Sequence, residues 1–180
     1  GNDNFNSIGL IVDYLCRTGE PPCFLEMPEV NVNAVERRMA YISTMERLGH
    51  QPHVVPVSGY DWAFEELGYE EGIRLISQRE FPSGTVLCAN DRLAIGLLAA
   101  AYAKGLRVGR GPGCAMRIAG HDDHPLARYT CPPLTTVAQD YTALADRSVE
   151  SLFALIEGGD SRHVPAIQKL EGRLIMRDSA

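Results

Sequence analysis

The feature of this chain that most constrains its fold is a unit that recurs four times between residues 8 and 119. Each unit is an amphipathic helix, a closing glycine and a short strand of apolar residues. The helical stripes lie within residues 8–15, 35–45, 64–76 and 93–101, and the strands at 23–27, 53–57, 85–89 and 114–119. Strands that are apolar throughout are covered on both faces, and helical crossovers make them parallel. We therefore predict a doubly wound, three-layer α/β/α fold with a mostly parallel sheet.

Local signals refine this pattern. Gly19 is expected to end the first helix in the left-handed conformation, and Gly49 and Gly105 to end the second and fourth. Pro56 removes a backbone donor from the second strand, which should therefore lie at a sheet edge or end early. The apolar stripe of the second helix consists of Val35, Met39, Ile42 and Met45.

The last third of the chain departs from the repeat. An amphipathic helix carries apolar residues between positions 145 and 156 and is ended by Gly158 and Gly159. The tail, residues 164–180, is expected to form two short strands around Gly172.

Composition excludes several functional classes. The formal net charge of −6 disfavours direct contact between this segment and nucleic acid. No apolar run is long enough to span a membrane, and no secretory signal opens the sequence. The five cysteines are scattered without C-x-x-C spacing, which indicates reduced thiols in a cytoplasmic protein rather than a zinc site.

Polar residues follow two of the predicted strands. Asn90 and Asp91 follow the third strand, and the run His121-Asp122-Asp123-His124 follows the fourth. Ligands of doubly wound sheets bind beyond the carboxyl ends of the strands, so both groups should face one cleft. Simpler interpretations are that Asp123 caps a turn and that Asn90 or Asp91 is the N-cap of the fourth helix, a role we assign to Asp91.

Two chemical interpretations of the run 121–124 are weak. Four consecutive residues cannot all converge on one metal ion, and no other strand end supplies further ligands, so no metal site or cofactor is predicted. The chain has no G-x-S-x-G motif, and an acid–base pair of Asp122 and His124 is the remaining enzymatic hypothesis. We expect no enzymatic activity.

Three motifs together resemble the lactose-repressor/galactose-repressor family of bacterial transcription regulators. They are N-D-x-x-A-x-G at 90–96, the strand end G-H-D-D at 120–123, where the family has an aromatic residue after the glycine, and P-P-L-T-T at 132–136. A looser match is Arg37-Arg38-Met39-Ala40-Tyr41, in which Ala40 replaces a glycine. His121 is a departure, because tyrosine or phenylalanine is common there.

The resemblance implies a periplasmic-binding-protein-like core of two lobes. Residues 1–134 would form the C-terminal lobe, residues 135–163 would cross into the N-terminal lobe and contribute a helix there, and residues 164–180 would return. The DNA-binding helix-turn-helix and most of the N-terminal lobe would lie outside this chain.

The resemblance also implies five ligand-binding residues. Arg37 would fork onto ligand oxygens, and Trp62 would stack on the ligand. Asn90 would both donate to and accept from hydroxyls, and Asp122 would accept from adjacent hydroxyls. Tyr141 would line the far side of the cleft.

The implied function is effector sensing by a repressor. A small polar effector, such as a sugar, would bind between the lobes and change operator binding by the missing DNA-binding segment. A homodimer is expected, with contacts near Ala63–Phe64 and along the 93–101 helix. The alternative is a solute-binding protein of a sugar transporter, which shares the fold but requires a secretion signal or a lipid anchor.

Overall fold

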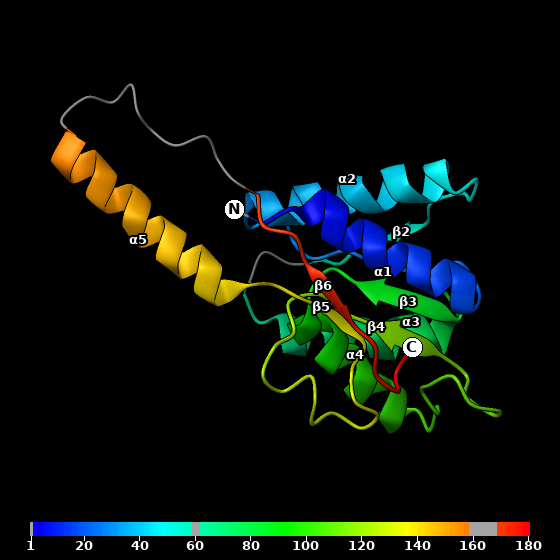
Figure 1. Cartoon of the computed structure of the whole chain (residues 1–180). Helices are drawn as coiled ribbons and strands as arrows, with labels where there is room; N and C mark the ends of the chain where they lie inside the picture. Colours follow the sequence, from blue (N-terminus) through cyan, green and yellow to red (C-terminus); the bar gives the residue numbers. More distant parts are fainter. Residues whose placement is uncertain (1, 59–61, 159–168) are drawn as a thin grey trace.

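The computed structural model describes residues 2–58, 62–158 and 169–180, and its centre is a parallel sheet. The strands are β1 (Cys23–Leu25), β2 (Val54–Val55), β3 (Thr85–Cys88) and β4 (Arg117–Ala119), in the order β2-β1-β3-β4 (Figure 1). β2 is short and lies at the edge, as Pro56 predicted. The predicted doubly wound α/β fold is confirmed.

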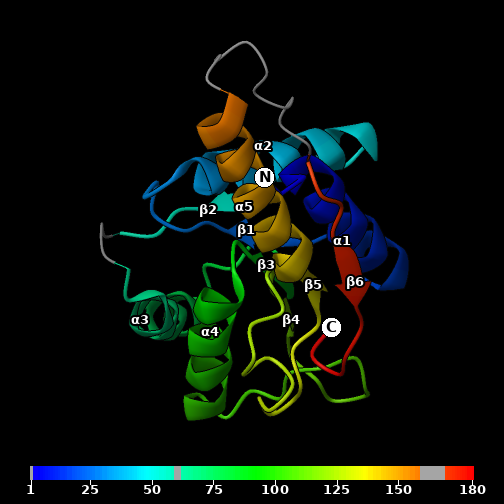
Figure 2. The same ribbon diagram turned by 60° about the vertical axis from the view of Figure 1, so that its left-hand side comes forward.

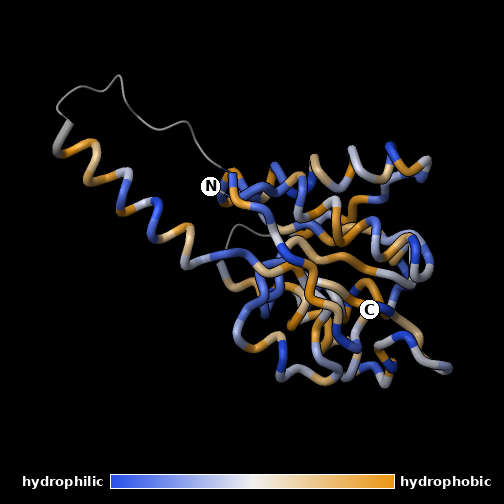
Figure 3. Tube along the Cα trace, viewed as in Figure 1, coloured by the Kyte–Doolittle hydropathy of each residue, from blue (hydrophilic) through white to orange (hydrophobic). Residues whose placement is uncertain are grey.

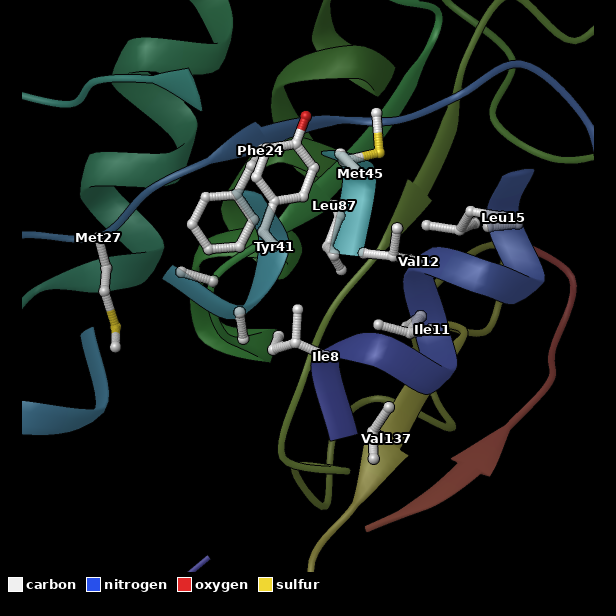
Figure 4. Close-up of a cluster of buried hydrophobic side chains, with 14 of the residues drawn as sticks. Ile8, Ile11, Val12, Leu15, Phe24, Met27, Tyr41, Met45, Leu87 and Val137 are labelled. Atoms are coloured by element: carbon white, nitrogen blue, oxygen red, sulfur yellow. The ribbon is translucent and has the colours of Figure 1, made fainter. Parts of the chain in front are cut away.

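Helices cover both faces of this sheet. α1 (Asn4–Thr18) and α2 (Val32–Arg47) lie on one face, and α3 (Phe64–Gln78) and α4 (Asp91–Ala103) lie on the other (Figures 1 and 2). The α1 side is closed by aliphatic residues of α1 packed on Phe24, Tyr41 and Leu87 (Figure 4). The Phe24 and Tyr41 rings stack with their centroids 5.0 Å apart. Burial of such side chains contributes about 1.5–3 kcal/mol each.

The contact between α3 and α4 depends on glycines. A Cβ atom added to Gly68 would lie 2.2 Å from the Leu93 carbonyl oxygen, and one added to Gly96 would lie 2.1 Å from the Glu65 carbonyl oxygen. The two helix backbones therefore touch directly. Gly68, which weakens α3 by propensity, is needed for this packing.

A second, smaller sheet follows the four-stranded one. β5 (Thr136–Ala138) pairs antiparallel with β6 (Arg173–Ile175). Between them in the sequence, α5 (Tyr141–Gly158) extends away from the body of the protein (Figure 1), and hydrophobic and hydrophilic residues alternate along its trace (Figure 3). Its apolar residues Val149, Leu152, Phe153, Leu155 and Ile156 are exposed.

Several local predictions were wrong. Gly19 has an extended backbone with φ 177°, not a left-handed one, whereas Gly49 and Gly105 do have positive φ values. The stripe predicted for α2 is right at Met45, which is 1% exposed, and at Ile42, which packs against the core, but it is wrong at Met39, which is 52% exposed while Arg37 and Tyr41 point inward. The strands at 23–27 and 114–119 are shorter than predicted. Two predictions are not tested in full, because the tail strand expected before Gly172 and the helix end at Gly159 fall wholly or partly outside the described residues; the strand after Gly172 is β6.

Candidate effector site

A cleft of about 340 Å³ lies at the carboxyl ends of β1, β3 and β4. All five residues predicted to bind a ligand line it: Arg37, Trp62, Asn90, Asp122 and Tyr141. They come from α2, the segment before α3, the ends of β3 and β4, and the start of α5. The structure thus brings together side chains that are up to 104 positions apart (141 − 37). Their role in ligand binding remains a prediction.

The floor of the cleft is an ion pair between Arg37 and Asp122. Arg37 Nη2 donates to Asp122 Oδ1 at 2.6 Å, and Nη1 contacts Oδ2 at 3.3 Å. Arg37 is only 4% exposed, and it also donates to the Ala89 carbonyl at 2.8 Å and to Asn4 Oδ1 at 3.2 Å. The buried guanidinium is therefore compensated within the protein, as a buried charge must be.

Asp122 is held as a carboxylate in an unusual backbone conformation. Burial raises the pKa of this group, but hydrogen bonding from His121 and the charge of Arg37 outweigh burial and hold the pKa below its ordinary value. Asp122 has φ 119° and Asp123 has φ 50°. Positive φ at Asp122 costs about 1–3 kcal/mol and is typical of functional sites.

The backbone N–H of Asp122 donates to the Val137 carbonyl in β5 at 2.9 Å. Asp123 is not the predicted turn cap. Its carboxylate accepts from Arg177 at 2.6 Å.

Asn90 both begins α4 and faces the cleft. Its Oδ1 accepts from the Leu93 backbone at 2.8 Å, so the N-cap is Asn90 and not Asp91. Its Nδ2 lies 3.1 Å from Met27 Sδ. Because sulfur is a weak acceptor, this amide keeps a donor for a ligand.

Aromatic side chains form the walls. Trp62 is 55% exposed and meets Phe64 edge to face, with ring centroids 5.7 Å apart. Arg92 lies over Phe64 and is paired with Glu65 through two hydrogen bonds of 2.6 and 2.7 Å. The Tyr141 hydroxyl donates to the Asp122 carbonyl at 3.0 Å, which ties the start of α5 to the end of β4.

Several residues that line the cleft were not predicted from the sequence, and most of them carry side-chain amides. The missed lining residues are Asn2, Met27, Asn31, Asn33, Phe64, Arg92 and Gln139. Asn31 caps α2 by accepting from Ala34, and an N-cap signal before α2 could have identified it. Gln139 donates to Asp122 Oδ1 from the segment that follows β5. No local pattern marks Gln139, because its partner belongs to another strand end.

Asp91 is buried behind the cleft and joins three segments. Its Oδ1 accepts from Thr136 Oγ1 at 2.6 Å, and its Oδ2 accepts from the His124 backbone at 2.7 Å. Its own N–H donates to the His121 carbonyl. Burial is the main cause that raises the pKa of Asp91 to about 7.

This pKa makes stability depend on pH. A carboxyl group with a raised native pKa binds more protons in the folded than in the unfolded state, so the free energy of unfolding falls as pH rises from about 4 to about 7. Asp91→Asn removes this contribution. We expect the stability of the variant relative to the wild type to increase by about 2–3 kcal/mol between pH 5 and pH 8, measured by urea unfolding. An unchanged difference at the two pH values would contradict the assignment.

Two general findings concern the described residues. Among residues 2–58, 62–158 and 169–180, no group of three or more His, Cys, Asp or Glu side chains is arranged to hold a metal ion. No helix in the same residues has the length and hydropathy needed to cross a membrane.

Known proteins share this fold and part of this sequence. The profile of the periplasmic binding protein-like domain family matches residues 3–180. The lactose operon repressor of Klebsiella pneumoniae is 32% identical over 179 residues, which cover 99% of this chain and 48% of that protein. The ribose operon repressor of Haemophilus influenzae is 30% identical over 133 residues, 74% of this chain and 37% of that protein.

A solved structure of a lac repressor has the same fold as this chain. The lac repressor dimer bound to operator and the anti-inducer ONPF has a TM-score of 0.85 and 27% identity, and the match covers 99% of this chain and 59% of that chain. The chain spans less than half the length of the two curated relatives above.

The fold and the family profile define a periplasmic-binding-protein-like domain. Within that class, the chain belongs to the lactose-repressor/galactose-repressor family and forms part of its effector-binding region. The three relatives described above are repressors, which gives no support to the alternative of a transporter's solute-binding protein.

Proposed function

We propose that this chain is the effector-sensing part of a transcriptional repressor, and that its cleft binds an uncharged, polyhydroxylated ligand such as a sugar. The observation that carries the proposal is the convergence of Arg37, Trp62, Asn90, Asp122 and Tyr141 on one cleft. Their chemistry combines a flat aromatic face with groups that bind hydroxyls.

The charge balance of the cleft supports an uncharged ligand. Arg37 is neutralised by Asp122, and Arg92 by Glu65. The other polar lining groups include amide side chains such as Asn33 and Gln139, which both donate and accept. A phosphate or carboxylate ligand would have to break one of these ion pairs, whereas hydroxyls can bind without doing so.

The proposed mechanism is a change in the arrangement of two lobes. Residues 1–134 would form the C-terminal lobe, residues 135–163 would belong to the N-terminal lobe, and residues 164–180 would return. A ligand shifts such an equilibrium only through different affinities for the two arrangements. The direct bond from Tyr141 to Asp122 supports this scheme, because it joins the proposed start of the second lobe to the cleft floor.

The proposed division into lobes predicts that replacing an exposed apolar residue of α5 destabilises the full-length protein. Phe153 on α5 is 56% exposed, and we propose that the rest of the N-terminal lobe covers it in the full-length protein. Phe153→Ser should then destabilise the full-length protein by about 3 kcal/mol in thermal or urea unfolding. Met39→Ser is the control, since Met39 is equally exposed at 52% and should cost no more than about 0.5 kcal/mol. Equal, small effects would argue against the division.

We further propose a cytoplasmic homodimer that binds operator DNA through a segment outside this chain. The predicted dimer contact along the 93–101 helix remains part of this proposal, although Leu93, Ala94, Leu97, Leu98 and Ala101 are buried within the subunit. Any contact through α4 must use its outer side. The ligand site involves no chemical step, and none of its residues is assigned a catalytic role.

Isothermal titration tests the function directly. Full-length protein would be titrated with neutral sugars, the matching sugar phosphates and sugar acids, and purines, and the binders would be tested for a change in operator affinity. We expect a neutral sugar to bind and to alter operator binding. Tighter binding of an anionic compound would contradict the ligand class, and the absence of any binder that alters operator affinity would contradict the function.

A further inference from the structure

We propose that His121 is a positioning residue of the effector site, which holds the Asp122 carboxylate so that one oxygen is presented to the ligand. A buried hydroxyl, that of Ser7, fixes the imidazole for this task. The inference rests on the proposed function for its ligand and on the geometry of three side chains for its mechanism.

The three side chains form a continuous chain of hydrogen bonds. His121 lies at the end of β4 and is 0% exposed. Its Nδ1 is 3.0 Å from Asp122 Oδ1, and its Nε2 is 2.8 Å from the hydroxyl oxygen of Ser7 in the first turns of α1. Ser7 is buried as well. Both imidazole nitrogens are therefore engaged away from solvent.

The partners determine the protonation of the ring. Burial, followed by the charge of Arg37, lowers the pKa of His121 below its ordinary value, so the ring is neutral at pH 7. A carboxylate can only accept, which requires the proton on Nδ1. Nε2 is then bare and accepts the Ser7 hydroxyl. The Ser7 hydroxyl also lies 3.4 Å from the Asn4 carbonyl, but its 2.8 Å contact with Nε2 is the shorter one, and donation along it supports the tautomer that can donate to Asp122.

The hydrogen bond from His121 makes the two carboxylate oxygens of Asp122 different. Oδ1 accepts from Arg37 Nη2, from His121 Nδ1 and from Gln139. Among the residues that the structure describes, Oδ2 has only the longer contact with Arg37 Nη1 at 3.3 Å, so it retains the capacity to accept from a ligand hydroxyl. With φ 119°, Asp122 occupies a backbone conformation that its neighbours must impose, and His121 is the adjacent residue.

A nucleophilic role for the same three groups does not fit the structure. Serine, histidine and aspartate in this order form a catalytic array only where the serine oxygen reaches a substrate. Ser7 is 2% exposed and does not line the cleft, so its hydroxyl serves the ring instead.

The first test needs no ligand. Nitrogen-15 NMR of the full-length protein with labelled histidine, in which His121→Phe identifies the signal, would give the tautomer of His121 at pH 7. We expect a proton on Nδ1 and none on Nε2, and a shift toward mixed tautomers in Ser7→Ala. A proton on Nε2, or on both nitrogens, overturns the proposal whatever the titrations show.

The second test separates positioning from packing. His121→Asn keeps a donor near the position of Nδ1 but leaves unfilled space, whereas His121→Phe fills the space and has no donor. Affinity for D-ribose, D-galactose, D-glucose and lactose would be measured together with the melting temperature. We expect Phe to weaken binding about 10-fold and Asn no more than about 3-fold, although Asn has the lower melting temperature.

The control is His124→Phe, which lies outside the cleft and should not change affinity. Affinities that follow the order of melting temperatures would mean that His121 acts only through packing, and would overturn the proposal. If none of the four sugars binds the wild type, the proposed ligand class is contradicted. The tautomer measured by NMR then decides whether His121 positions Asp122.

Discussion

Arg37→Ala should destabilise the protein by about 3–5 kcal/mol and weaken effector binding at least about 100-fold. The substitution leaves the Asp122 carboxylate without its cation, and it removes donors to Ala89 and Asn4. A buried charge that loses its partner costs much more than a surface pair contributes. Urea unfolding and isothermal titration of the full-length protein would measure the two effects.

Arg38→Ala is the matched control for this prediction. The neighbouring arginine also pairs with carboxylates, at 2.7 Å from Glu29 and 3.5 Å from Glu26, but its side chain is 33% exposed. We expect a loss of at most about 1 kcal/mol and unchanged binding. The double variant Arg37→Met with Asp122→Asn should recover most of the stability but none of the binding. Equal losses of stability and affinity for Arg37→Ala and Arg38→Ala would show that the buried ion pair contributes no more than the exposed one.

Gly96→Ala should destabilise the protein by about 3 kcal/mol or more. The added Cβ would lie 2.1 Å from the Glu65 carbonyl oxygen and 2.7 Å from the Tyr69 nitrogen, both in the α3 backbone. Backbone atoms cannot rotate away, so α3 and α4 must separate and expose part of the apolar core between them. This cost must exceed the gain of about 1 kcal/mol that alanine brings to a helix.

Gly111→Ala is the control, because a Cβ there would have no neighbour within 4 Å. Thermal unfolding should place that variant within about 0.5 kcal/mol of the wild type. A Gly96→Ala variant as stable as the wild type would mean that the two helices are not packed backbone to backbone.

The sequence predicted the layers of the fold because they follow from periodicity. Apolar strands between amphipathic helices require a covered parallel sheet, and Pro56 placed β2 at its edge. All five site residues were predicted from the family resemblance, and Asn90 and Asp122 also from their positions directly after two predicted strands. Their convergence on one cleft followed from the rule that parallel strands present their carboxyl ends together.

The sequence could not predict partners that are distant along the chain. Hydrophobicity selected Met39 of α2 wrongly, whereas ion pairing and hydrogen bonding draw Arg37 and Tyr41 inward. Asp123 was assigned to a turn because Arg177, its partner, is 54 positions away. His121 was identified only as a departure from the family pattern, since its bond to Ser7 spans 114 positions.

The most direct test of the central claim is a crystal structure of the full-length protein with the sugar that binds most tightly in titration. We predict electron density for the sugar between Trp62, Asn90 and Asp122, with a hydroxyl within hydrogen-bond distance of Asp122 Oδ2. Density for the sugar at another place, with this cleft holding only water, would contradict the account.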